Sequence, residues 1–217
     1  MKFKGIIFDL DGTLADTGGD LANAINLMLG SFEFEKKSQD EILKHINFGA
    51  RAFVRGCLPE THKDFLDEAF KRYIKFYGEH YLEKTYVYDK IPELIKSLQE
   101  NKIKLCVLSN KQDNMTKKVV GGLFDAGDFT VILGGSERFP HKPEPDSALY
   151  LAEQMKTDPC EVLFIGDSDV DIKTAINAKM FPLGVTWGYR PESLLIESGA
   201  KKIVHDPGEI LDFILNN

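Results

Sequence analysis

The sequence predicts an α/β fold in which a doubly wound parallel sheet carries an inserted all-helical cap domain. Two observations predict the sheet. Short, fully apolar runs recur along the chain, as in strands buried on both faces of a parallel sheet, and helical patterns of about 10–15 residues separate them. A third observation predicts the insertion, because from about residue 20 to residue 88 the alternation stops and only helical patterns remain.

The predicted strands follow from the apolar runs in chain order. They cover residues 3–8, 103–108, 131–133, 162–165 and 181–185, with a short sixth segment at 202–204. Apolar side chains at helical spacing place a helix after most of these runs. The predicted helices of the core cover residues 92–100, 115–123, 147–155, 171–178 and 192–198.

The insertion is predicted as a set of helices. Apolar side chains recur at helical spacing over residues 21–29. Ser38 and Glu41 fit a capping box for a helix over 42–46, and an aromatic stripe marks a long amphipathic helix over 65–80. We interpret this stripe as the core of the cap itself.

This pattern divides the chain into two domains. The core is expected from residues 1–16 and 89–217, and the cap from residues 17–88. In open α/β sheets the binding site lies beyond the carboxyl ends of the strands, so the cap is expected to cover that edge. Hinges near residues 16–19 and 86–89 would let it close and exclude water.

The composition is that of a globular protein with an acidic balance. Of the 217 residues 43% are hydrophobic, and 34 Asp and Glu outnumber 27 Lys and Arg, which gives a net charge of −7. This charge argues against a nucleic-acid or anionic-membrane partner. No stretch approaches the ~20 apolar residues that span a bilayer. The start of the chain lacks the apolar run of a signal peptide, and the three cysteines form no CxxC pair. We therefore expect a cytoplasmic protein, either a monomer or a homodimer.

Two polar clusters follow the first two predicted strands. Asp9 and Asp11 lie in a turn with Gly12, where two carboxylates could share a divalent cation or act as nucleophile and acid/base. A solvated acidic turn is the alternative. Ser109 and Asn110 follow the second strand and could hold phosphate oxygens, although the same residues could simply cap the next helix.

Two further clusters follow later strands. Lys142 stands between a strand and a helix, and the two prolines that follow it within three residues stiffen its backbone. An ordinary turn is the alternative here. Asp167 and Asp171 follow another apolar strand and could face the same cation, or could form an acidic helix start that the helix dipole favours.

Taken together, these clusters make the chain resemble the haloacid dehalogenase superfamily of phosphohydrolases. The resemblance covers nearly the whole chain and implies a Rossmann-like core, and the helical insertion is similar to the family's first type of cap. The four motifs are the DxDGT of Asp9–Thr13, Ser109, Lys142 with its following proline, and the GDSxxD of Gly166–Asp171.

The resemblance implies a reaction. Asp9 would attack phosphorus and form an aspartyl-phosphate, and Asp11 would protonate the leaving alcohol and later deprotonate the water that releases phosphate. Lys142, Ser109 and Asn110 would bind the transferring phosphoryl group. A dehalogenase has no alkoxide to protonate, so the second aspartate favours phosphoryl transfer.

The resemblance also implies Mg²⁺ as cofactor. Asp9, the backbone carbonyl of Asp11, and Asp167 would hold the ion, and Asp171 would orient either its water or Lys142. Hard oxygen ligands suit Mg²⁺, whereas no cluster of His and Cys offers a zinc site.

The substrate is expected to be a small phosphate ester. The C-terminal stretch Gly184–Arg190 is similar to the phosphoglycolate phosphatase branch, so 2-phosphoglycolate is the first candidate. Arg51 in the cap is the candidate partner for its carboxylate, because a guanidinium pairs with a carboxylate bidentately. The alternatives are a pyrophosphatase, a phosphosugar phosphatase, a phosphosugar mutase and a binding protein without activity.

Overall fold

A computed structural model describes residues 3–216 and contains a six-stranded parallel sheet. The strand order is β5-β4-β1-β6-β7-β8, so β1 lies inside the sheet with parallel neighbours on both sides. The predicted α/β class is therefore confirmed. The strands are β1 (Gly5–Phe8), β4 (Lys104–Gln112), β5 (Val131–Gly135), β6 (Val162–Gly166), β7 (Phe181–Val185) and β8 (Lys202–Val204).

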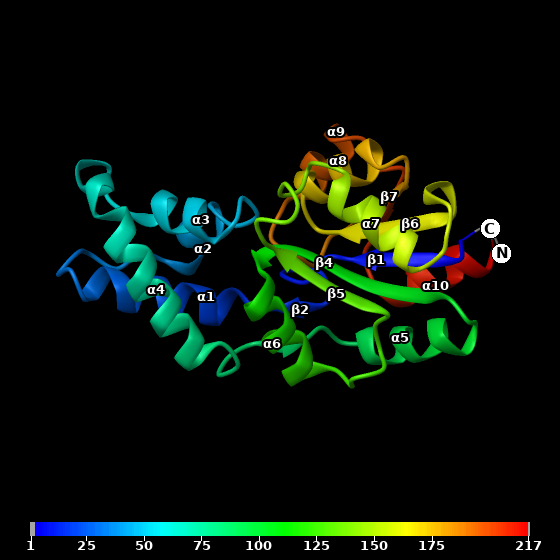
Figure 1. The fold of residues 1–217 in the computed structure, drawn as a ribbon, viewed down its shortest axis with the longest axis horizontal. Helices are drawn as coiled ribbons and strands as arrows, with labels where there is room; N and C mark the ends of the chain where they lie inside the picture. Colours follow the sequence, from blue (N-terminus) through cyan, green and yellow to red (C-terminus); the bar gives the residue numbers. More distant parts are fainter. Residues whose placement is uncertain (1–2, 217) are drawn as a thin grey trace.

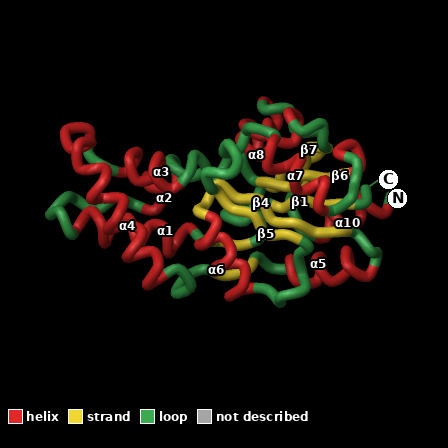
Figure 2. Tube along the Cα trace, in the orientation of Figure 1, coloured by secondary structure: helices red, strands yellow, loops and turns green. Residues whose placement is uncertain are grey.

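Helices cover both faces of this sheet (Figures 1 and 2). Side chains alternate between the faces of a strand, so Ile6 and Phe8 of β1 pack into one apolar cluster and Ile7 packs into another. The first cluster includes α5 (Ile91–Glu100), α6 (Asp113–Leu123) and α10 (Gly208–Leu215), and the second includes α7 (Asp146–Gln154) and α8 (Asp169–Asn177). The short α9 (Glu192–Glu197) packs beside β7 and β8.

A second set of helices forms the cap at one end of the molecule (Figure 1). It has its own apolar cluster, to which buried aromatic residues such as Tyr73 and Tyr77 belong. The aromatic stripe of the sequence therefore packs inside the cap, as expected. The helices are α1 (Gly18–Gly30), α2 (Gln39–Leu43), α3 (Ala50–Cys57) and α4 (Leu66–His80), with a 3₁₀ turn at Glu60–Phe65.

The two connections between cap and core run side by side. The sequence predicted no strand between the first two core strands, but β2 (Ala15–Asp16) pairs antiparallel with β3 (Tyr86–Val87). The buried carboxylate of Asp20 accepts hydrogen bonds from Lys84 N at 3.0 Å and from Thr85 N at 2.9 Å. These contacts join the start of α1 to the segment before β3, directly beside the two predicted hinges. The division at residues 16/17 and 88/89 itself stays a prediction.

Some boundaries differ from the prediction. The capping box is present, because Glu41 N donates to Ser38 Oγ while Ser38 N donates to Glu41 Oε2, but α2 ends at Leu43. Residues 44–49 therefore form a loop instead of the last helical turn. Helices α3 and α10 were not predicted. Within the described residues, no helix is both long and apolar enough to cross a membrane.

Candidate active site

Asp9 and Lys142 form a buried ion pair at the carboxyl end of β1. Asp9 continues the sheet, since its N–H donates to Ile165 O at 2.9 Å, and its carboxylate lies 2.8 Å from Lys142 Nζ. Lys142 also donates to Asp171 Oδ1 at 2.7 Å and to Leu108 O at 3.1 Å. An ammonium group has three N–H donors, so these three contacts fix its position. In this arrangement Lys142 has no free N–H for a ligand, and it would act on a ligand through its buried positive charge.

Asn110 holds the backbone around Lys142. Its side chain accepts from Lys142 N at 2.8 Å and donates to Lys142 O at 2.9 Å, and it also donates to Asn47 O in the cap at 2.7 Å. Ser109 lines the cavity beside Asp9. Strand β4 continues through both residues with an irregular register between Leu108 and Gln112, a distortion that re-aims side chains next to active sites. Neither residue caps the next helix, which begins at Asp113.

Three buried carboxylates could hold a metal ion. One oxygen from each of Asp9, Asp167 and Asp171 lies within 4.8 Å of the others. Asp171 also accepts from Ser168 Oγ at 2.6 Å in a capping box that begins α8. Asp167 Oδ2 accepts from Tyr189 N at 2.7 Å, whereas Asp167 Oδ1 is buried without a hydrogen-bond partner among residues 3–216. A buried carboxylate oxygen without a partner is costly, and a cation would satisfy it.

Two glycines make room for Asp167. Gly12 adopts φ +87°, and a Cβ there would lie 2.5 Å from Asp167 Oδ2. A Cβ at Gly188 would lie 2.2 Å from Asp167 Cβ. Both approaches are far closer than van der Waals contact allows, so the carboxylate is held between two backbones that only glycine permits.

The carboxylates of Asp9, Asp167 and Asp171 repel one another, and few basic side chains of the described residues lie near them. Burial, and then the charge of Asp171, raise the pKa of Asp9 well above its ordinary value and raise the pKa of Asp167 to about 7. Burial opposes the charge of Lys142, but Asp171 and Asp9 outweigh it and raise the pKa of Lys142. The site therefore favours added positive charge.

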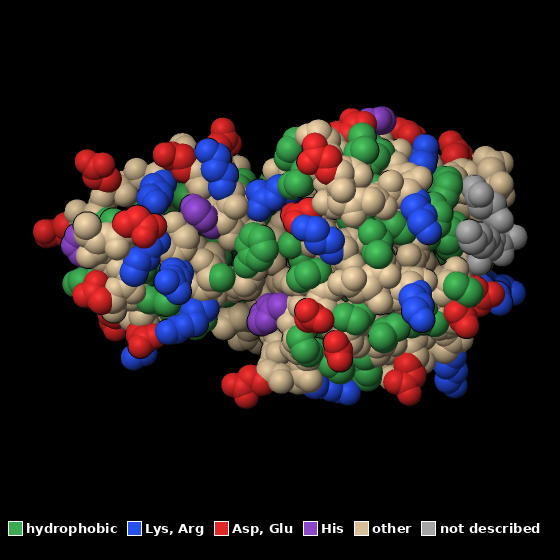
Figure 3. Space-filling model, turned by 90° about the horizontal axis from the view of Figure 1, so that it is seen from above, with side chains coloured by type: hydrophobic (Ala, Val, Ile, Leu, Met, Phe, Trp, Pro, Cys, Tyr) green, Lys and Arg blue, Asp and Glu red, His purple; other side chains and the backbone are tan. Residues whose placement is uncertain are grey.

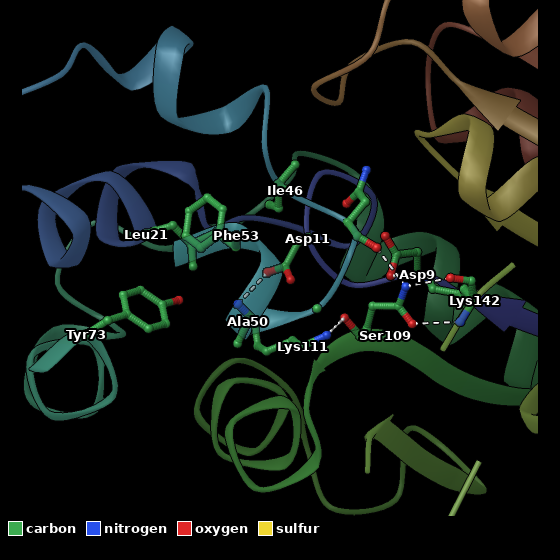
Figure 4. Close-up of a pocket in the computed structure, with 13 residues that line it drawn as sticks. Asp9, Asp11, Leu21, Ile46, Ala50, Phe53, Tyr73, Ser109, Lys111 and Lys142 are labelled. Carbon is green, nitrogen blue, oxygen red and sulfur yellow. Dashed lines mark hydrogen bonds and ion pairs between the residues drawn. The ribbon is translucent and has the colours of Figure 1, made fainter. Parts of the chain in front are cut away.

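Asp11 faces the cap instead of the carboxylate cluster. Its Oδ1 accepts from Thr17 Oγ1 at 2.5 Å and lies 3.0 Å from Lys111 Nζ, which also donates to Tyr77 OH at 2.9 Å. Figure 4 shows Asp11 between the core residues Asp9 and Lys142 and the cap side chains. Its side chain is thus not part of the carboxylate cluster, and a metal contact through its backbone carbonyl stays a prediction.

A cavity lies between core and cap above these residues. The core side supplies every acidic and basic side chain that lines it, whereas the cap side is mainly apolar, with one tyrosine and one asparagine. Figure 4 shows Leu21, Phe53 and Tyr73 on the cap side. The cap lining consists of Leu21, Ile46, Asn47, Gly49, Ala50, Phe53 and Tyr73.

Arg51 lies outside this cavity. Its guanidinium pairs with Asp67 on the surface of the cap, where the two side chains are 55% and 79% exposed. Its assignment as a substrate-binding residue therefore stays a prediction that this arrangement of the cap does not favour. Figure 3 shows the narrow waist between cap and core on one face, with charged groups of both signs scattered over the cap.

Two basic residues at or beside the site were given no role from the sequence. Lys111 follows the Ser109–Asn110 pair and lines the cavity. Arg190 ends the C-terminal stretch that carried the resemblance, and it donates to the cap carbonyls of Leu43 at 3.0 Å and Ile46 at 3.1 Å. The sequence signal that could have identified both residues is their position: each lies next to, or at the end of, a stretch that carried the family resemblance.

Comparison with known proteins agrees with this geometry. Residues 6–185 match the family described as haloacid dehalogenase-like hydrolase. The chain belongs to this family. The expected family resemblance is thereby confirmed over most of the core and the whole insertion.

Relatives within the hydrolase family narrow the assignment to a phosphatase. Phosphoglycolate phosphatase of Aquifex aeolicus (strain VF5) is 33% identical over 188 residues, 85% of each chain. That of Pasteurella multocida (strain Pm70) is 30% identical over 221 residues, which cover 98% of this chain and 99% of the relative. The crystal structure of a "predicted phosphoglycolate phosphatase" from Haemophilus somnus 129pt superposes with a TM-score of 0.91 at 27% identity, covering 99% of both chains. This hydrolase is therefore a phosphatase similar to the phosphoglycolate phosphatase branch.

Proposed function

We propose that the protein hydrolyses a small anionic phosphate monoester, with 2-phosphoglycolate as the first candidate, through an aspartyl-phosphate on Asp9 and with Mg²⁺. The observation that carries the proposal is the division of labour between the two aspartates. Asp9 lies in the carboxylate cluster beside Lys142, while Asp11 faces the cavity where a leaving group would lie. The names of the relatives support the choice of substrate.

The reaction takes two steps on these residues. A carboxylate oxygen of Asp9 forms a bond to phosphorus while the bond from phosphorus to the ester oxygen breaks, and Asp11 gives that oxygen a proton. A water molecule then attacks phosphorus, the bond to Asp9 breaks, and Asp11 takes the proton of the water. The products are the alcohol and inorganic phosphate, and both aspartates return to their starting states.

The residues present fit Mg²⁺. Within the described part of the chain, Asp167 Oδ1 has no hydrogen-bond partner, and the cluster consists of carboxylates without His or Cys. Asp9 and Asp167 would hold the ion with the backbone carbonyl of Asp11, and Asp171 would orient its water or Lys142. When bound, the ion supplies positive charge that offsets repulsion between the phosphate and Asp9. Lys142, whose Nζ lies 2.8 Å from Asp9 Oδ1, would add a second positive charge beside the transferring phosphoryl group.

The cap wall favours a short substrate. Leu21, Ile46 and Phe53 offer no hydrogen-bonding side-chain atoms, so sugar hydroxyl groups that face them would lose hydrogen bonds to water, and only Asn47 and Tyr73 on the cap side could replace some of these bonds. This cost disfavours phosphosugar phosphatase and mutase activities. Pyrophosphate is equally short, and it remains the alternative substrate.

Phosphate release from a panel of esters tests the proposal. We expect 2-phosphoglycolate to be hydrolysed with a kcat/KM at least about tenfold above those of pyrophosphate, sugar phosphates and nucleoside monophosphates, a difference of about 1.4 kcal/mol. Chelation of divalent metal should abolish the release. A preference for pyrophosphate would contradict 2-phosphoglycolate as the substrate. Turnover that survives chelation would contradict the metal-dependent mechanism.

A further inference from the structure

Lys111 is a buried cation that crosses from core to cap. Its backbone belongs to β4, and its side chain is only 6% exposed. The ammonium donates to Tyr77 OH at 2.9 Å and lies 4.7 Å from the centre of the Tyr77 ring. It lies 3.0 Å from Asp11 Oδ1, which makes it the nearest cation to that carboxylate among the described residues.

The cavity contains two cations with different tasks. Lys142 and Lys111 are the basic side chains that line it within residues 3–216. Lys142 uses its three donors on Asp9, Asp171 and the carbonyl of Leu108. Lys111 contacts two groups, so one of its N–H donors has no partner in the described part of the chain. Lys111 therefore retains the capacity to bind an anion.

The position of Lys111 limits how far an anionic group bound to it can lie from the ester oxygen of the substrate. In the proposed reaction the ester oxygen lies at Asp11, whose carboxylate is 3.0 Å from Lys111 Nζ. In 2-phosphoglycolate a single carbon separates the ester oxygen from the carboxylate. A group this close to the ester oxygen falls within reach of Lys111, whereas a longer chain would meet Leu21 and Phe53.

We propose that Lys111 binds the second anionic group of the substrate, a carboxylate attached to the carbon that bears the ester oxygen. This inference rests on the proposed phosphatase function and makes Lys111, not Arg51, the residue that selects an anionic ester. The side chain is buried and held by Tyr77, so little conformational entropy is lost on binding. Removing the charge should therefore penalise the anionic substrate specifically.

The test compares two substrates that differ only in this group. Ethyl phosphate has the same two carbons as 2-phosphoglycolate but lacks the carboxylate. We expect Lys111→Met to lower kcat/KM for 2-phosphoglycolate about 100-fold and that for ethyl phosphate less than about fivefold. The loss for 2-phosphoglycolate should appear mainly in KM. Lys117→Met is the matched control, because Lys117 pairs with Asp113 on the exposed surface, and it should change neither value.

Each outcome decides between the alternatives. Equal losses on both esters would overturn the proposal, because Lys111 would then act through Asp11 on the chemistry itself. Lys111→Gln provides the same comparison if the methionine variant fails to fold. If the wild-type protein prefers pyrophosphate, the carboxylate assignment is overturned along with the substrate. If the wild-type protein hydrolyses 2-phosphoglycolate and Lys111→Met changes kcat/KM for neither ester, the phosphatase function stands and only the role of Lys111 is contradicted.

Discussion

The two sides of the active-site cavity are built in different ways. On the core side, backbone hydrogen bonds of the sheet set the positions of the charged groups, and these groups bind one another: Lys142 alone joins Asp9, Asp171 and a carbonyl of β4. On the cap side, the lining is mostly apolar and belongs to a separate hydrophobic cluster. In the proposed mechanism the core would supply the reacting groups, and the cap would supply shape and exclude water.

Few groups connect the two sides, and these are expected to couple closure to catalysis. Arg190 of the core binds carbonyl groups at the end of α2, and Asn110 binds the carbonyl of Asn47 in the following loop. The neighbour of Arg190, Tyr189, donates to Asp167 in the carboxylate cluster. A short segment of the core thus contacts both the cap and the candidate metal site.

Replacing Asp9, the proposed nucleophile, should have the largest effect. We expect Asp9→Asn to lower phosphate release by at least about 10⁴-fold, because an amide cannot form the acyl-phosphate bond. The variant should remain folded, since asparagine is nearly isosteric and burial disfavours the charged form of Asp9. Steady-state phosphate release and circular dichroism measure the two quantities. Activity close to that of the wild type would contradict the assignment of Asp9.

Weakening the metal site should have the next largest effect. We expect Asp167→Asn to reduce apparent Mg²⁺ affinity by about 10- to 100-fold, since it removes the charge from the oxygen that lacks a partner. Calorimetric titration with Mg²⁺ measures this directly. Asp169→Asn is the control, because Asp169 lies outside the carboxylate cluster and pairs with Lys173 along α8, so the variant should leave the titration unchanged. Identical titrations for both variants would argue against a metal at Asp167.

The same carboxylates predict how stability depends on pH in the absence of metal. Asp9 and Asp167 have raised pKa values in the folded protein, the latter about 7, against about 4 for an unfolded chain. Between these pH values the folded state binds more protons, so their contribution to the unfolding free energy decreases as pH rises. Urea unfolding with chelator at pH 5 and pH 7 tests this. The decrease should be smaller in Asp167→Asn, and an equal or larger decrease there would contradict the assignment.

Loosening the contact between cap and core should have a moderate effect. We expect Arg190→Ala to lower kcat/KM about tenfold, because residues 43–46 lose their hydrogen bonds to the core while the charged groups of the site remain. Hydrogen exchange in residues 43–49 should accelerate. Arg72→Ala is the matched control, since Arg72 binds Glu68 and Ser31 within the cap. Unchanged exchange and activity in Arg190→Ala would show that this contact does not hold the cap.

Arg51→Ala should have the smallest effect. Because Arg51 pairs with Asp67 on the exposed surface of the cap, we expect a change of less than about twofold in kcat/KM for 2-phosphoglycolate. A rise in KM comparable to that of Lys111→Met would restore Arg51 as a substrate-binding residue, and would imply a cap position different from this one.

The core could be predicted from the sequence because its local signals agree with its tertiary structure. The runs at 181–185 and 202–204 match β7 and β8, since strands packed between helices need apolar residues on both faces. The strand order also brings Asp9, Lys142, Asp167 and Asp171 together, although the motifs that contain them are far apart in sequence.

The cap and the contacts between domains were harder to predict, for physical reasons. Helix α3 escaped prediction because it has only eight residues, of which Phe53, Val54 and Cys57 are buried. Lys111 and Arg190 look like surface cations in sequence, and only packing of cap against core reveals what they contact. The expected binding of phosphate by Asn110 stays a prediction; packing of cap against core shows that its amide contacts three backbone groups, of Asn47 and Lys142.

Trapping the phosphorylated enzyme tests the central claim most directly. Protein mixed with Mg²⁺ and 2-phosphoglycolate, quenched in acid within one turnover and digested, should yield a peptide containing Asp9 that carries one phosphoryl group. Asp9→Asn should yield none. A phosphoryl group on any other residue, or turnover without a phosphorylated peptide in quenches spanning the whole turnover, would contradict the division of labour between Asp9 and Asp11.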